Sequence, residues 1–189
     1  DHDLRVVGSH HVFGAGRTFG IATGLWLSVS SPVPRVVVPT DWRPENAGRG
    51  IAVGIGPDES AANAIAFGVQ RALALGEPLK LISGWGLPAF LSRPAEMMGG
   101  GIAPVGEQFQ NTLNEIVSNL KAANPDLVVS GKAEESTSPA RAILESSRHS
   151  NMLVLGTHSY GTFGRALFGS TTNSVLGNLL VPTVIVPMK

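Results

Sequence analysis

A run of small and hydroxylated residues near the end of the chain has the composition of an anion-binding site. Residues 152–156, MLVLG, predict a buried strand that stops at a glycine. A loop follows, and it ends in residue types that suit the first turn of a helix: Gly169, Ser170, Thr171 and Thr172. Free backbone N–H groups and the positive end of a helix dipole favour negative charge. The stretch therefore predicts a phosphate site, with three hydroxyls able to add hydrogen bonds.

From Gly50 onward, short apolar runs alternate with longer amphipathic runs, which is typical of a parallel α/β sheet. Strands are expected at residues 51–55, 79–82 with an extension to Trp85, 127–130, 152–155 and 183–186.

Several helix boundaries can be assigned from residue type. Asp58 or Ser60 can cap the helix that follows the first strand, and Gly76 suits its end. Ser138 and Pro139 form a second helix start, with a capping hydroxyl before a proline at the first position.

The glycine spacing resembles that of the universal stress proteins of the ATP-binding type. These proteins carry Gly-x2-Gly-x9-Gly-Ser/Thr after their fourth strand. Gly156, Gly169 and Ser170 match three of the four positions, and Ser159 replaces the second glycine. A serine in the left-handed region costs about 1–2 kcal/mol, or about tenfold in affinity. The resemblance implies an adenine nucleotide such as ATP, with Mg²⁺ as a candidate companion, bound with moderate affinity.

The resemblance also implies where the nucleoside lies. In the ATP-binding members an acidic residue after strand 1 helps to hold it, and the matching position here is Gly56. The tip of strand 2, near Gly84, is expected beside the adenine, and the end of strand 4 beside the ribose and phosphates. The expected nucleotide-binding residues are Gly54, Ile55, Gly56, Gly84, Leu155, Gly156, Ser159, Gly169, Ser170, Thr171 and Thr172.

The fold implied by this resemblance is adenine nucleotide alpha hydrolase-like. It has a five-stranded parallel sheet with helices on both faces and strand order 3-2-1-4-5. In open α/β sheets, ligands bind at the point where the strand order reverses. We therefore expect the ligand crevice between strands 1 and 4.

The front of the chain resembles its end. Residues 4–39 match residues 152–187 in order, with Gly8 at the place of Gly156 and VVVP at the place of VIVP. Their separation is about one domain of this family. We expect a β-α-β half-domain, the C-terminal part of a first universal stress domain, at 1–41, a linker at 42–50 and a complete domain at 51–189.

Domains of this family commonly pair through their last strands. The two candidates here are residues 35–38 and 183–186, both apolar and both followed by proline. Antiparallel pairing would cover two sheet edges at once. We therefore expect an intramolecular ladder between them, and a homo-oligomer or pseudo-dimer.

The composition excludes several kinds of protein. Fourteen basic residues balance 14 acidic ones, which argues against a nucleic-acid or anionic-membrane partner. There is no cysteine, and the five histidines show no paired spacing with carboxylates, so a metal site is not expected. The longest apolar run outside the strands falls short of the ~20 residues that span a bilayer. Cytoplasmic location is the default expectation.

The sequence contains no catalytic constellation. It lacks both Gly-x4-Gly-Lys-Ser/Thr and Gly-x-Ser-x-Gly. We therefore expect a binding or regulatory protein, with slow ATP hydrolysis at most. Two functions remain open: an ATP-binding regulatory module in the stress response, and a non-nucleotide-binding dimeric stress protein that acts through protein partners.

Overall fold

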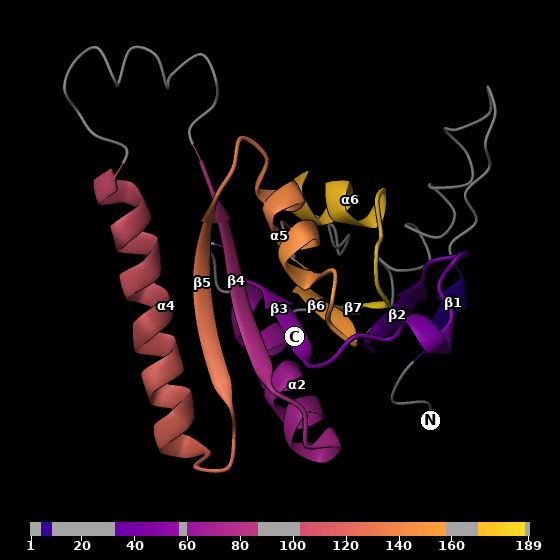
Figure 1. Ribbon diagram of the computed structural model, residues 1–189, viewed down its shortest axis with the longest axis horizontal. Coiled ribbons are helices and arrows are strands. Elements are labelled where there is room, and N and C mark those ends of the chain that lie inside the picture. The colour runs from indigo at the N-terminus through magenta and orange to yellow at the C-terminus, as the bar shows by residue number, and fades with distance from the viewer. Residues whose placement is uncertain (1–4, 9–32, 57–59, 87–102, 158–169, 188–189) are drawn as a thin grey trace, which may run out of the picture.

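The computed structural model describes residues 5–8, 33–56, 60–86, 103–157 and 170–187. In this part of the chain one seven-stranded sheet is covered by helices on both faces (Figure 1). Its elements, in chain order, are β1 Arg5–Gly8, β2 Arg35–Val38, the short 3-10 helix η1 Pro44–Asn46, β3 Ile51–Gly54, α2 Ser60–Leu75, β4 Leu79–Trp85, α4 Ala103–Ala123, β5 Val129–Glu135, α5 Pro139–Ser147, β6 Met152–Gly156, α6 Ser170–Leu176 and β7 Thr183–Val186.

The sheet is α/β and mostly parallel, as expected. It has seven strands, because β1 and β2 join the five strands expected for the rest of the chain. The strands lie in the order β1-β2-β7-β6-β3-β4-β5. The pairs of neighbours are parallel except for β2 and β7. The two front strands therefore extend the sheet of the rest of the chain.

The expected antiparallel ladder between residues 35–38 and 183–186 is present. Arg35 lies opposite Ile185, and Val37 lies opposite Thr183. The helix expected between β1 and β2 falls outside the described residues. That the ladder joins two universal stress domains remains a prediction.

Side chains alternate between the two faces of the sheet, as strand geometry requires. Leu81 packs with the core cluster under α2 and α4, whereas its neighbour Ile82 packs with Ile143 of α5 and Val175 of α6. Strands buried on both faces in this way read as nearly continuous apolar runs. This explains why β3, β4, β6 and β7 were visible in the sequence.

The end assigned to α2 and the start assigned to α5 agree with the structure. Of the two candidate caps of α2, Asp58 falls outside the described residues and Ser60 is already the first helical residue. Helix α2 starts at Ser60, and Gly76 follows its last residue with φ of 63°, the left-handed conformation that glycine adopts at low cost. Ser138 caps α5, because its hydroxyl accepts a hydrogen bond from the N–H of Arg141 at 3.4 Å, and Pro139 occupies the first helical position. Among the described helices, none combines the length and the apolar character needed to cross a membrane.

The predicted position of the third strand of the complete domain was wrong. The sequence predicted residues 127–130, whereas β5 covers Val129–Glu135. This strand lies at the end of the sheet, and after the buried Val129 its residues are exposed or half-buried. A search for continuous apolar runs finds only its first residues, because its later ones are polar or charged.

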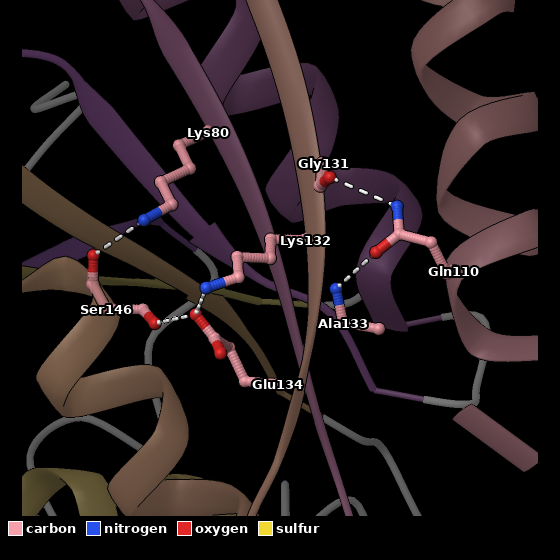
Figure 2. Close-up of polar contacts among 7 residues, drawn as sticks. All are labelled: Lys80, Gln110, Gly131, Lys132, Ala133, Glu134 and Ser146. Atoms are coloured by element: carbon pink, nitrogen blue, oxygen red, sulfur yellow. Dashed lines mark hydrogen bonds and ion pairs between the residues drawn. The ribbon is translucent and has the colours of Figure 1, made fainter. Parts of the chain in front are cut away.

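A polar network joins β5 to α5 and β4 (Figure 2). Lys132 Nζ lies 2.9 Å from Glu134 Oε1, and the hydroxyl of Ser146 donates to the same oxygen at 2.8 Å. Lys80 donates to the carbonyl oxygen of Ser146 at 3.3 Å. Burial raises the pKa of Glu134, but the hydrogen bonds from Lys132 and Ser146 and the charges of both lysines outweigh it, so this pKa lies below its ordinary value.

This shift predicts a pH-dependent loss on Ser146→Ala. A carboxyl group with a lowered folded-state pKa stabilises the fold above its unfolded-state pKa and loses that contribution as the pH falls through the folded-state value. The variant should therefore lose about 1 kcal/mol of unfolding free energy near neutral pH, and less once Glu134 is protonated. Urea unfolding near pH 7 and near pH 3 measures both. A loss that is the same at both pH values would contradict this role of Glu134.

Candidate functional site

A cavity of about 440 Å³ lies at the carboxyl ends of β3 and β4. Small-molecule sites typically span about 300–1,000 Å³, so this cavity is large enough for a ligand. Its described lining comes from the end of β3, the first turns of α2, β4 and one side of α4: Ile55, Gly56, Ala61, Ser83, Gln108, Phe109, Thr112, Leu113 and Ile116. Three segments of the chain, within 55–61, at Ser83 and within 108–116, therefore meet at one edge of the sheet.

The aromatic wall of the cavity is held in place by Trp85. The rings of Trp85 and Phe109 are stacked, with centroids 6.2 Å apart and planes 14° from parallel. Gly106, one turn earlier in α4, contacts the Trp85 ring so closely that a Cβ there would collide with it. Such packing fixes the start of α4 against β4 and keeps the Phe109 ring at the cavity.

The structure brings the expected residues of β3 and β6 together. Gly54 lies directly opposite Leu155 on the neighbouring strand, and a Cβ at Gly54 would lie 2.5 Å from Cδ2 of that leucine. Ile55 continues β3 and donates its N–H to Ile82 at 2.8 Å. Ile55 and the residue after it, the exposed Gly56, line the cavity.

Gly84 has a packing role that the sequence did not predict. A Cβ there would lie 2.5 Å from the carbonyl oxygen of Pro139 and 2.7 Å from its Cα. The absence of a side chain therefore lets the first turn of α5 rest against β4. Gly84 does not line the cavity in the described part of the chain, and its expected place beside a base remains a prediction.

The expected phosphate residues are only partly described. Helix α6 starts at Ser170, Thr172 is buried and Thr171 is half-buried. Ser159 and Gly169 fall outside the described residues. Helix α6 is seven residues long. Gly156 ends β6, and the next residue, the buried Thr157, donates its N–H to Val186 at 3.1 Å.

The sequence argument missed Ser83 and the contribution of α4. Ser83 is buried at the cavity, and a hydroxyl between the apolar residues and the glycine at the end of the strand was a signal for it. Gln108 and Thr112 carried no such signal, since exposed polar residues are ordinary on a helix, and Phe109 was visible only as one of the apolar positions of that helix. The described lining contains no charged side chain, and no group of three metal-binding side chains occurs among the described residues.

Comparison with known proteins decides the family. The sequence model of the universal stress protein family matches residues 49–187. The chain belongs to the universal stress protein family.

Universal stress proteins of Mycobacterium bovis and Mycobacterium tuberculosis are 27% identical over 184 residues. Each alignment covers 92% of this chain and 60% of the relative. The chain thus spans well under two thirds of the length of these relatives.

Solved universal stress protein structures share the fold. One from Archaeoglobus fulgidus aligns over 99% of this chain and 63% of its own, with a TM-score of 0.68 and 15% identity. Another from the same organism, described as a complex with dAMP, aligns over 73% of this chain and 97% of its own, with a TM-score of 0.53 and 16% identity.

Proposed function

We propose that this universal stress protein is a regulatory module that binds an adenine nucleotide at the carboxyl ends of β3, β4 and β6. The cavity between Ile55, Ser83 and Phe109 carries the proposal. It lies beside β3, which has β4 on one side and β6 on the other. The chain leaves β3 for β4 and later returns to the other side at β6, which is the arrangement in which open α/β sheets bind ligands.

The chemistry of the cavity suits a base and a ribose better than phosphates. Phe109, Ile55 and Leu113 supply apolar surface, while Ser83 and Thr112 supply hydroxyls. The phosphates would lie toward Gly156 and the start of α6, where backbone N–H groups and the hydroxyls of Thr171 and Thr172 can donate. The nucleotide complex of a structural neighbour supports this choice of ligand. ATP, with Mg²⁺ carried by its phosphates, is the proposed form.

Binding rather than turnover is proposed, because the described cavity offers no acid or base to act on a bound nucleotide. A cytoplasmic location and pairing between two universal stress domains through β2 and β7 complete the proposal.

Filling the cavity should remove nucleotide binding. Thr112 is an exposed residue of α4 whose side chain lines the cavity, so Thr112→Phe should weaken ATP binding at least about tenfold. Asn111→Phe is the matched control, since this neighbour is also exposed but does not line the described cavity. Calorimetric titration measures all three proteins. No heat from the wild type at millimolar ATP, or equal affinities for the two variants, would reject the proposal.

One observation favours the second candidate, a dimeric stress protein that acts through protein partners without a nucleotide. Gly56 stands where the ATP-binding members have an acidic residue, and the described lining supplies no carboxylate to bind the ribose hydroxyls in its place. Mass spectrometry of the denatured purified protein separates the two candidates. A co-purified adenine nucleotide supports the first candidate. Its absence, together with no heat from the wild type in the ATP titration, supports the second.

A further inference from the structure

Strand β5 is the last strand of the described sheet, so one of its hydrogen-bonding sides faces away from β4. On the inner side, Val128 accepts from the N–H of Leu79, and Ser136 donates to the carbonyl oxygen of Trp85, both at 2.8 Å. Backbone groups of successive strand residues point to opposite sides. The odd-numbered residues of β5, including Gly131 and Ala133, therefore direct their N–H and C=O groups outward.

The outward groups at the centre of β5 are occupied by one side chain (Figure 2). Gln110 of α4 accepts a hydrogen bond from the N–H of Ala133 at 2.9 Å and donates to the carbonyl oxygen of Gly131 at 3.2 Å. A neighbouring parallel strand would bond to the same two groups, one as acceptor and one as donor. The Gln110 amide thus takes the place of a further strand.

Asn114 holds this amide in position. Its Oδ1 accepts the second hydrogen bond from Gln110 Nε2, at 2.9 Å. Rotating the amide by half a turn would place its NH₂ group against the N–H of Ala133 and its oxygen against two acceptors. Only one orientation of Gln110 therefore satisfies all three contacts.

A second copy of this chain has the charges to pair with β5 if the Gln110 amide is absent. When two β5 strands run antiparallel with Ala133 of each at the centre, Lys132 of one lies opposite Glu134 of the other, twice by symmetry. Opposite charges on directly facing residues stabilise a strand pair. Lys132 pairs with Glu134 of its own strand, but its side chain is 61% exposed and can also reach a second strand. Ala133 then faces its counterpart as a hydrogen-bonded pair through its outward groups.

We propose that the outer side of β5 is a strand-pairing surface for a second copy of this chain, and that Gln110 keeps it closed. Unpaired strand edges are sites of unwanted association, and proteins commonly block them. The proposal is independent of the nucleotide, since it uses no residue that lines the cavity.

Gln110→Ala tests the proposal. The variant should self-associate with a dissociation constant at least about tenfold lower than that of the wild type in sedimentation velocity runs. Adding Ala133→Pro should abolish this gain, because proline removes the outward N–H at the centre of the pair, and an edge strand tolerates proline there. Gln110→Met keeps the length of the side chain and removes its hydrogen bonds, so this variant should also associate. It provides the test if alanine disturbs α4.

Charge variants identify the partner strand. In the Gln110→Ala background, Lys132→Glu should weaken association, because it places two carboxylates opposite each other. Adding Glu134→Lys should restore it, since the exchanged charges again face their opposites. Circular dichroism checks that each variant is folded. The proposal fails if folded Gln110→Ala and Gln110→Met both sediment like the wild type, or if their association is indifferent to Ala133→Pro and to the charge exchange.

Discussion

Gly84→Ala is expected to lower the free energy of unfolding by about 2–3 kcal/mol. The added Cβ would lie 2.5 Å from the carbonyl oxygen and 2.7 Å from the Cα of Pro139. These are backbone atoms of the first turn of α5, so no side-chain rotation can relieve the contact. The helix would have to move away from β4, and its own buried residues Ile143 and Leu144 would lose part of their packing.

Gly177→Ala is the matched control. A Cβ there would make only ordinary contacts, at 3.6 Å and beyond, and this glycine does not have a positive φ. Its unfolding free energy should stay within about 0.5 kcal/mol of the wild type. Denaturant unfolding measures both variants. Equal losses at the two positions would show that the contact between β4 and α5 is not tight.

Leu81→Ala should cost about 2–5 kcal/mol of unfolding free energy. Leu81 is 0% exposed at the centre of β4 and packs with Ile51 and Val53 beneath α2. Interiors are closely packed, so the neighbours can fill only part of the resulting cavity. The lost dispersion contacts and the residual void both add to the cost.

Leu75→Ala makes the same chemical change at the surface. Leu75 ends α2 and is 54% exposed, so its truncation should change the unfolding free energy by less than about 0.5 kcal/mol. The difference between the two leucines therefore isolates burial from residue type. Comparable losses at both positions would place Leu81 outside the core.

The parts of the fold that the sequence predicted were those with a local cause. Gly76 needs a left-handed backbone, and Ser138 followed by Pro139 caps a helix, whatever the rest of the chain does. The pairing of β2 with β7 was predicted from the resemblance instead, because domains of this family commonly pair through their last strands. The position of β5 was predicted wrongly, because it is the last strand of the described sheet and its residues after Val129 are exposed or half-buried, so they form no apolar run.

The candidate site was less predictable, because tertiary packing brings its residues together. A sequence shows where glycines lie but not why a side chain is excluded there. At Gly84 a Cβ would collide with the backbone of α5, and at Gly54 it would collide with the side chain of Leu155. The cavity wall formed by Phe109 and Thr112 comes from a helix whose position over β4 is a matter of tertiary packing. Side chains brought together by packing alone leave no spacing to recognise.

The antiparallel ladder of β2 and β7 has a consequence for the order of folding. Arg35 and its partner Ile185 are separated by about 150 residues, so their contact closes a very long loop, and such contacts form late. At about 5–20 residues per second, synthesis needs on the order of 10 s to supply β7 after β2 has emerged. During that interval the side of β2 that β7 will cover has no native partner, so this strand is open to association with other chains.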